Sequence, residues 1–536
     1  MKRACVAVLC AFCTNTKNSL EAHFAPLMRD LIRLYLETDP HILALAAEAL
    51  LALVKQLRPG EDGDSRVMEI RGAVRSAAQS LRKDFGINSD QRDGPLLPGL
   101  CTAKGAEPLI SVYKDVLLNC SPELKEVAAI GLGEMIVLTD PPCLSHRFVS
   151  NFTGPLIRVL GDRYAPSLKT AVLHTLTLLL RRVNSQLKPF LPQLYATFSR
   201  ALTDPHRGVR LKGAVALGCL AQIYPKPAAI VQELHNQVKT VDDPSVRETL
   251  LFGLRCVLER LPPAGQASTN QLTDIQRRSL VQSLVAYGTS AEDTCRRQAA
   301  ACLGAFCRSL PPEELTTILS QYVFENQPGS EWTATHFRAL SLQVALRLAA
   351  DQLVPSHLQE LETCLQSLLT SDKGPVVETA LRATGFLLLH CAKNGQKMPI
   401  PLLTTFAKTM NKSSTEVKQL LGEVIHFVCS QCDLPVSYAR VLVLHLVNGT
   451  KEKNSIVRAN AEFALIAMLR MTGGAAEDKS PAMRELENAL DGGAREALID
   501  VYNKTLVRAA HKMHLQHGST PMAAIQPDQI DDTILV

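Results

Sequence analysis

Apolar residues recur at helical spacing through most of the chain, in runs separated by short polar turns. One such unit begins at Leu202 and reads L-T-D-P-H-R-G-V-R-L-K-G-A-V-A-L-G. Asp204 is predicted to cap the helix by accepting backbone N–H groups at its start, and Pro205 favours the turn because it lacks a backbone donor. The apolar positions that would face a neighbouring helix are Val209, Ala214, Leu217 and Leu220.

The same plan of polar turn, basic residue, small residue and apolar helix recurs along the chain. Its turns are anchored at Ser121, Asp162, Asp204, Asp243, Asp293, Asp372, Ser413 and Lys453. These anchors are 41, 42, 39, 50, 79, 41 and 40 residues apart, and the longest gap holds two units, one of them irregular, around Glu331 to Ala350. A two-helix repeat of this period is typical of HEAT and armadillo proteins, in which neighbouring units stack to bury their apolar faces. We therefore predict an all-α fold, a HEAT/armadillo-type α-solenoid of roughly 9–12 two-helix repeats.

Two features inside the unit have structural interpretations. A basic residue follows the turn in five units, at Lys125, Lys169, Arg210, Arg247 and Arg296. We expect it to bond the preceding unit's turn. Glycine weakens a helix, so the glycines at 213 and 218 are predicted to allow two helices to approach closely.

Breaks in the repeat suggest how the chain is divided. The expected parts are HEAT repeats at 1–58, a loop-rich insertion around one short helix at 59–105, repeats with a basic ridge at 106–261, a linker at 262–273, repeats at 274–471, a loop at 472–481, terminal helices at 482–514 and a mobile tail at 515–536. The first residues imitate a secretory signal, with Met1-Lys2-Arg3 before an apolar stretch. They lack a small-residue cleavage site, so we predict a helix instead.

Composition narrows the class of protein. With 46% hydrophobic residues the chain is too apolar to be mainly disordered, and without an uncharged apolar run of 18 residues it is not expected to enter a membrane. Its 15 cysteines lie mostly in apolar helical runs, which indicates reduced core residues and a cytoplasmic location. The pairs Cys10/Cys13 and Cys429/Cys432 are too far apart in a solenoid to share a zinc ion, so both are predicted to belong to the core.

The sequence contains no motif of enzyme chemistry. A P-loop, a G-x-S-x-G elbow, an H-E-x-x-H pair and a dinucleotide fingerprint are all absent. His511 and His514 are near each other, but no carboxylate or cysteine is patterned with them. We therefore predict a protein that is not an enzyme, with no catalytic residue, no cofactor and no metal site.

Charge gives the first indication of function. Residues 163–232 contain one acid and ten basic residues, which are Arg163, Lys169, Arg181, Arg182, Lys188, Arg200, Arg207, Arg210, Lys212 and Lys226. Such an excess attracts acidic protein or phosphate surfaces, although a solvated surface plus the structural basic position would also produce it. Four of the ten are expected at helix ends or turns, where stacked repeats would form one partner-binding ridge: Arg181, Arg182, Lys188 and Arg207.

Four stretches resemble a known family. They are S-P-E-L-K-E-V-A-A-I-G-L-G-E at 121–134, T-G-P-L-I-R-V-L-G-D-R-Y at 153–164, L-K-P-F-L-P-Q-L-Y-A-T-F-S-R-A-L-T-D-P-H-R-G-V-R-L-K at 187–212, and D-D-T-I-L-V at 531–536. Together they resemble the C-terminal part of the giant HEAT-repeat translational activators of the general-control kinase, which phosphorylates eukaryotic initiation factor 2α. The resemblance covers nearly all of the chain and is weakest in 59–105 and 311–370.

The resemblance implies a function in translational control under amino-acid starvation. In that family the C-terminal region binds the RWD domain of the kinase, and other RWD-containing proteins share or compete for it. The binding segment would fall in roughly residues 1–295, with Lys125 at the position where the fungal form has an arginine. We expect Lys125 to be exposed and to contact the partner. The family's ribosome-binding parts lie N-terminal to this region, so the chain is expected to be a fragment, a truncated gene model or a shortened paralogue.

Two other classes of function stay open at this point. One is an RNA-binding or ribosome-binding solenoid that uses the basic ridge within 163–232, and the other is a general HEAT scaffold or transport adaptor. Steep salt dependence of RNA binding would favour the first, capture of an RWD domain would favour the kinase activator, and binding of neither would leave the scaffold.

Overall fold

The chain folds into stacked helices that form two compact units, Met1–Leu261 and Pro262–Val536. The structure is a computed structural model. It describes residues 1–56, 63–84, 96–102, 104–144, 146–161, 163–263, 272–290, 292–324, 331–411, 414–432, 434–470 and scattered positions between 487 and 503. The anchors Asp162 and Ser413, His511, His514 and the predicted tail lie outside the described residues. We call the two compact units unit 1 and unit 2.

Each unit consists of α-helices joined by turns and short 3-10 segments, and no strand occurs among the described residues. The α-helices of unit 1 are α1 (Lys2–Asn15), α2 (Phe24–Arg33), α3 (Pro40–Lys55), α4 (Gly63–Asp84), α5 (Glu107–Asn119), α6 (Pro122–Leu138), α7 (His146–Arg158), α8 (Pro166–Arg182), α9 (Leu191–Ala201), α10 (Arg207–Ala221), α11 (Pro227–Thr240) and α12 (Pro244–Leu258). Those of unit 2 are α13 (Asp274–Gly288), α14 (Asp293–Phe306), α15 (Pro312–Leu319), α16 (Trp332–Leu369), α17 (Gly374–Asn394), α18 (Ile400–Lys408), α19 (Thr415–Gln431), α20 (Val436–Gly449) and α21 (Ser455–Arg470). The predicted all-α repeat fold is confirmed.

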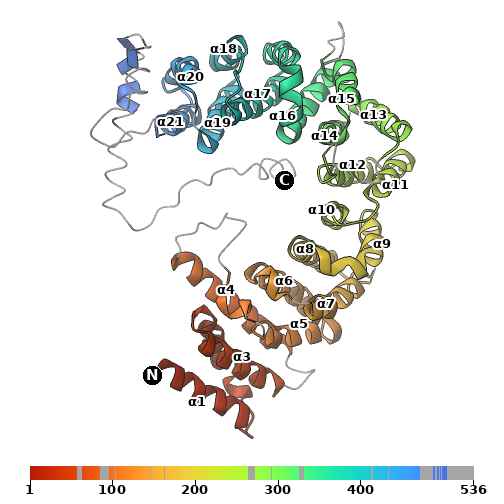
Figure 1. Cartoon of the computed structure of the whole chain (residues 1–536), viewed down its shortest axis with the longest axis vertical. Helices are drawn as coiled ribbons and strands as arrows, with labels where there is room; N and C mark the ends of the chain where they lie inside the picture. The colour runs from red at the N-terminus through yellow and green to blue at the C-terminus, as the bar shows by residue number, and fades with distance from the viewer. Residues whose placement is uncertain are drawn as a thin grey trace. The chain divides into compact units, whose positions relative to one another are not determined.

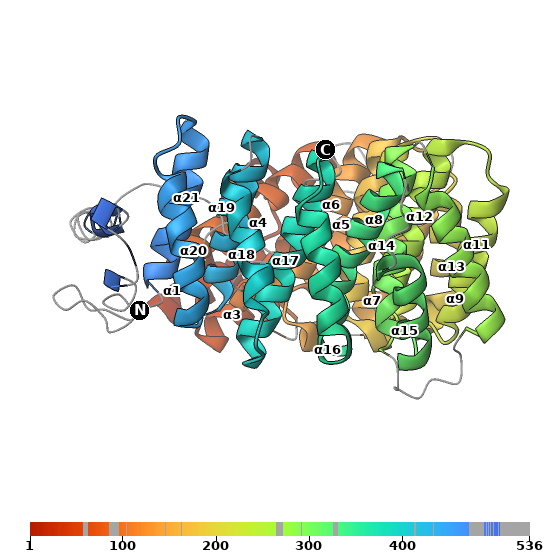
Figure 2. The same cartoon turned by 90° about the horizontal axis from the view of Figure 1, so that it is seen from above.

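The repeats of unit 1 form two layers. Helices α5, α7, α9 and α11 form one layer, the A layer, and α6, α8, α10 and α12 form the other, the B layer (Figure 1). Seen from above, the helices stand side by side (Figure 2). The core between the layers contains the predicted apolar face of α10, with Val209, Ala214, Leu217 and Leu220 all buried.

The two glycines of α10 lie where helices come close, as predicted. A Cβ at Gly218 would be 2.7 Å from the Cys256 carbonyl oxygen of α12, and one at Gly213 would be 2.8 Å from the Ala201 Cβ of α9. Gly208 of the same helix has more room, because its Cβ would meet only Thr170 Cγ2 at 3.7 Å. Hydrogen alone therefore fits at Gly218, while Gly208 tolerates a methyl group.

This difference predicts opposite effects for two alanine substitutions. Gly218→Ala should lower the free energy of unfolding by about 1–3 kcal/mol, because the methyl group meets rigid backbone of α12. Gly208→Ala is the matched control and should be neutral or stabilising by about 0.5–1 kcal/mol, since alanine favours the helix. Urea unfolding of both variants measures the two changes in the free energy of unfolding. Equal stability of the two variants would show that the close contact with α12 is not the reason for a glycine at position 218.

The segment predicted as an insertion contains a longer helix than expected. Helix α4 has 22 residues and packs against α2 and α6, so the prediction of one short helix was wrong. Its sequence has a low apolar content, and much of its burial depends on contacts with neighbours distant in sequence. The first helix of the chain, α1, was predicted correctly and packs against α3.

The irregular repeat coincides with a broken helix. Helix α16 is 38 residues long, but Ala349 and His357 have non-helical backbone angles and Pro355 lies between them. Proline removes a backbone donor and clashes with the preceding turn, so α16 is two helices that meet at a kink. The first of them packs on α14, where a Cβ at Gly304 would lie 2.5 Å from the Ser341 carbonyl oxygen. Helix α16 as a whole also packs on α17.

Buried histidines make the stability depend on pH. Burial, with Arg297 and Arg296 nearby, lowers the pKa of His336 in unit 2 to about 4. Burial and Lys239 likewise lower the pKa of His235 in unit 1 to about 4. The unfolded chain takes up protons on these rings below about pH 6.5, whereas the folded chain does not until about pH 4. The stability that comes from keeping these two histidines neutral is therefore fully present above pH 6.5 and is lost as the pH falls toward 4.

We expect each histidine to contribute on the order of 1–2 kcal/mol to the loss of stability between pH 7.5 and pH 5. His336→Leu should reduce that loss in unit 2, because leucine does not titrate. Urea titrations of wild type and variant at both pH values measure the difference. An identical loss in the two proteins would contradict the assignment.

Candidate partner-binding surface

The basic residue that follows the turn is buried in four of the five units in which it was predicted, and it is half-buried in the fifth, at Arg247. Lys125, Lys169, Arg210 and Arg296 are between 2% and 8% exposed. Lys125 Nζ donates to the Leu118 carbonyl oxygen at 3.3 Å, at the end of α5, and lies 5.5 Å from the centre of the Tyr164 ring. The prediction that Lys125 is exposed was wrong, because its amine closes the turn between α5 and α6.

Arg210 shows how this position connects repeats. Its guanidinium donates to the carbonyl oxygens of Asp204 and Pro205, in the turn before its own helix, at 3.1 and 3.0 Å. It also donates to the Ser245 and Thr249 hydroxyls of α12, at 2.6 and 3.0 Å. The expected bond to the preceding unit's turn was therefore wrong, since the partners lie in the residue's own turn and in the following unit.

Asp204 and Lys169 form a buried ion pair between two repeats. Lys169 Nζ of α8 lies 2.8 Å from Asp204 Oδ2, and the two side chains are only 9% and 8% exposed. The other carboxylate oxygen accepts the His206 N–H at 2.9 Å. Burial opposes ionisation of Asp204, but the bonds from Lys169 and His206 outweigh it and hold the pKa of the carboxyl below its usual value.

The cap prediction for Asp204 needs a correction. Helix α10 begins at Arg207 with His206 as its N-cap residue, and no side chain caps it. Asp204 instead accepts the His206 N–H with its side chain and so forms a turn directly before the N-cap residue. In the similar sequence before α12, Asp243 is the N-cap residue and accepts the Ser245 N–H, so the same residue pattern caps one helix directly and the other only through a preceding turn.

The remaining predicted residues do not form one ridge. Arg181 at the end of α8 and Lys188 are exposed, while Arg182 is half-buried and donates to the Val137 carbonyl oxygen at 3.1 Å. Arg207 lies 2.8 Å from Glu248 of α12. The start of α10 packs near Thr170 of α8, so Arg207 is separated from Arg181 by roughly 16 Å along the helix axis.

The exposed charge in this region is nevertheless basic. Burial, then Lys212 and Arg181, lowers the pKa of His174, so both cations lie near this imidazole on the B layer. The exposed basic residues within 163–232 are Arg163, Arg181, Lys188, Arg200, Arg207, Lys212 and Lys226. Asp204, the acid of this stretch, is held in its internal pair. Apart from Arg207, which is paired with Glu248, these cations give the surface a positive charge that can attract an anionic partner.

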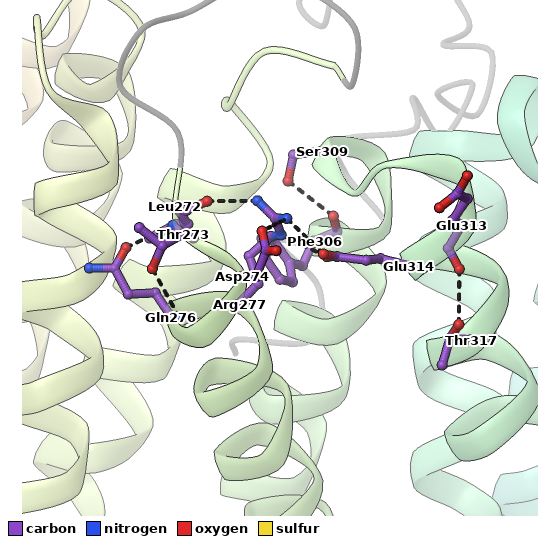
Figure 3. Close-up of polar contacts among 10 residues, drawn as sticks. All are labelled: Leu272, Thr273, Asp274, Gln276, Arg277, Phe306, Ser309, Glu313, Glu314 and Thr317. Atoms are coloured by element: carbon purple, nitrogen blue, oxygen red, sulfur yellow. Dashed lines mark hydrogen bonds and ion pairs between the residues drawn. The ribbon is translucent and has the colours of Figure 1, made fainter.

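Unit 2 contains a polar cluster that the sequence did not reveal. Arg277 of α13 bonds both carboxylate oxygens of Glu314 of α15, at 2.6 and 2.7 Å, and also the Leu272 carbonyl oxygen (Figure 3). These bonds raise the pKa of the guanidinium, with Glu314 the main cause. Thr273 and Gln276 form a reciprocal capping box at the start of the same helix (Figure 3). The Arg277–Glu314 pair connects α13 with α15. Of these contacts, only the capping box is recognisable from neighbouring residues in the sequence.

Three of the four paired cysteines lie within helices, whereas Cys432 directly follows the end of α19 in an extended conformation. Cys10, Cys13 and Cys429 are buried and Cys432 is half-buried, and burial raises the pKa of Cys429 to about 12. Within the ranges that the structure describes, no group of three or more His, Cys, Asp or Glu side chains is placed to hold a metal ion. No helix among these described residues is long and apolar enough to cross a membrane.

Comparison with known families gives matches over most of the chain. A family model described as "Stalled ribosome sensor GCN1-like, HEAT repeats" matches residues 228–534, and a second with the same description matches residues 1–104. The two models together leave 105–227 unmatched, which is the part that contains most of the basic stretch.

Individual relatives agree with the family models. The chain is 33% identical to human "Stalled ribosome sensor GCN1" over 541 residues, which is all of this chain and 19% of that protein. It is 25% identical over 428 residues to the "eIF-2-alpha kinase activator GCN1" of Dictyostelium discoideum, covering 79% of this chain and 15% of the relative. Among solved structures, a chain of the Kap95:Nup1 complex covers 96% of this chain and 70% of its own length, at 13% identity and a TM-score of 0.47. The chain thus spans about a fifth of the length of the curated relatives it matches.

Proposed function

Because the chain belongs to the GCN1-like family of HEAT-repeat proteins, we propose that it is a non-enzymatic binding protein of translational control in the cytoplasm. It binds the RWD domain of the kinase that phosphorylates initiation factor 2α and promotes activation of that kinase. The observation that carries this proposal is the similarity at 33% identity across the entire chain. Two of the relatives, from Dictyostelium and yeast, are named as activators of that kinase.

The charge distribution supports a partner surface on unit 1. Arg181 and Lys188 are exposed, and neither is engaged in an ion pair within the described part of the chain. Arg207 is exposed but shares its charge with Glu248. Exposed cations of this kind accelerate encounter with an acidic partner more than they tighten the final complex. Arg181 and Lys188 are thus the main contributors to attraction in our proposal.

Lys125 has a different role in this proposal. Its amine is held by the Leu118 carbonyl oxygen and lies near the Tyr164 ring, so direct contact with a partner would cost those interactions. We assign it a positioning role, in which it fixes the end of α5 and the neighbouring surface. An arginine at this position would carry more donors in a planar fork.

The proposal is tested by capture of purified RWD domains on the immobilised chain. The RWD domain of the kinase should bind, an RWD domain from another protein should compete with it, and a domain of a different fold should not bind. Failure of the kinase domain to bind would contradict the proposal.

The basic stretch also favours a second candidate, an RNA-binding solenoid. Its exposed cations other than Arg207, which is paired with Glu248, would replace counterions on a phosphate backbone, so affinity for RNA would fall steeply with salt. Titration of a structured RNA at two salt concentrations separates the candidates. Tight RNA binding that weakens steeply with salt, in the absence of RWD capture, would favour this alternative.

A further inference from the structure

Two adjoining hollows lie in the A layer of unit 1, among α5, α7 and α9. The first has a volume of about 400 Å³, with walls that include Leu118, Gly154 and Gln193. The second has a volume of about 270 Å³ and continues between α7 and the turn before α10. Both are lined by Ile157 and Arg158. The two hollows are therefore neighbours that share a wall on α7, and we call them together the α7 groove.

The walls of the α7 groove combine apolar side chains with free positive charge. Apolar walls come from Leu118, Pro155, Ile157 and Leu160, among others. Arg158 and Arg200 are exposed at its rim, and neither guanidinium has an acidic partner among the residues that the structure describes. The Lys169–Asp204 pair closes the floor of the second hollow with no net charge. The groove consequently presents two cations that have no acidic partner among the described residues, beside a surface that is partly apolar.

We propose that the α7 groove binds a short extended segment of a partner protein that carries acidic residues beside an aliphatic residue. The aliphatic side chain fills the apolar part of the groove, and the carboxylates contact Arg158 and Arg200, whose planar forks suit bidentate bonds. The peptide-binding proposal rests on the proposed function in one respect, because both place the partner surface on unit 1.

The lining of the groove favours a peptide over a single-stranded nucleic acid. Proteins that hold single strands stack the bases on aromatic side chains, and none of the residues that line the two hollows is aromatic. Apolar pockets flanked by arginine are instead typical of protein contacts, where arginine and well-packed apolar residues dominate the binding energy.

Two variants of the full chain remove the two parts of the interaction separately. Arg158→Glu with Arg200→Glu reverses the charge at the rim. Gly154→Leu fills the first hollow, because a Cβ at Gly154 meets no atom within 4 Å and leucine favours a helix more than glycine does. The matched control for charge is Lys393→Glu with Lys397→Glu, two exposed positions of unit 2 outside both hollows. Thermal unfolding checks that all variants fold.

The probe is a phage-displayed library of twelve-residue peptides selected on the full chain. We expect enrichment of sequences with two or more Asp or Glu next to Leu, Ile or Val. Synthetic versions should lose at least tenfold affinity for the Arg158/Arg200 variant and for Gly154→Leu, and less than threefold for the control. Absence of enrichment, enrichment of basic or neutral peptides, or equal binding to all variants would overturn the proposal.

Capture of the kinase RWD domain is measured on the same variants. Peptide binding that depends on the groove, without any RWD capture, would refute the proposed function and keep this inference. RWD capture by wild type, without any peptide that depends on the groove, would refute this inference and keep the proposed function.

Discussion

Lys169→Met should lower the free energy of unfolding of unit 1 by about 3 kcal/mol, because it leaves the Asp204 carboxylate buried without its partner. The pair is 2.8 Å long and both side chains are less than a tenth exposed, so solvent compensates little of the loss. Lys212→Met is the matched control on the neighbouring helix. Lys212 is exposed, and its loss should change stability by less than about 0.5 kcal/mol.

A double variant separates the lost charge from the lost packing. Asp204→Asn keeps an acceptor for the His206 N–H and removes the unpaired charge. Added to Lys169→Met, it should therefore recover part of the stability. Urea unfolding of the two single variants and the double variant gives the coupling energy. Additive effects would show that the two side chains do not interact.

The same pair predicts the response to acid. The pKa of Asp204 is lowered in the folded state, so its contribution is present at neutral pH and is lost as the pH falls below the usual range of aspartate. The Lys169→Met variant should lose less stability than wild type on acidification, because its carboxyl no longer gains from ionisation.

Charge reversal of Arg181 and Lys188 should slow association with the kinase RWD domain at least tenfold at low salt. Both side chains are exposed, and such charges act on the rate of encounter through long-range attraction. The salt dependence of the association rate should flatten at the same time, since fewer charges remain to be screened. Dissociation should change little.

The control for this variant changes the same charge in unit 2. Lys393→Glu with Lys397→Glu alters two exposed lysines and should leave the association rate within twofold of wild type. Stopped-flow or biolayer kinetics on melt-checked proteins give both rates. An equal slowing in the two variants would mean that net charge alone matters and that unit 1 has no special role.

The fold could be predicted because the information lies within single repeats. The apolar face of α10, the glycines at its contacts and the forty-residue period are all local patterns, and each corresponds to buried residues or close helix contacts. Helix α4 was underestimated because its sequence has few apolar residues, and its contacts with α2 and α6 come from distant parts of the chain.

The surface could be predicted only in part. Counting charges identified a basic stretch, but it could not show that Lys169 and Arg210 are buried between repeats or that Glu248 accompanies Arg207. The ion pair of Lys169 with Asp204 joins residues 35 apart, and that of Arg277 with Glu314 joins residues 37 apart. Pairing at such distances depends on the register of the stack, which a single sequence does not encode in any local motif. The exposure of Lys125 was misjudged for a local reason, because its amine bonds the Leu118 carbonyl oxygen seven residues earlier and no side-chain motif indicates that bond.

Our central claim is that unit 1 presents the surface for the RWD partner. Hydrogen–deuterium exchange of the full chain, with and without a saturating amount of the kinase RWD domain, tests it most directly. We predict slowed exchange on binding in peptides within Met1–Leu261, centred on residues 163–232, and unchanged exchange in unit 2. Protection confined to peptides of Pro262–Val536 would contradict the claim.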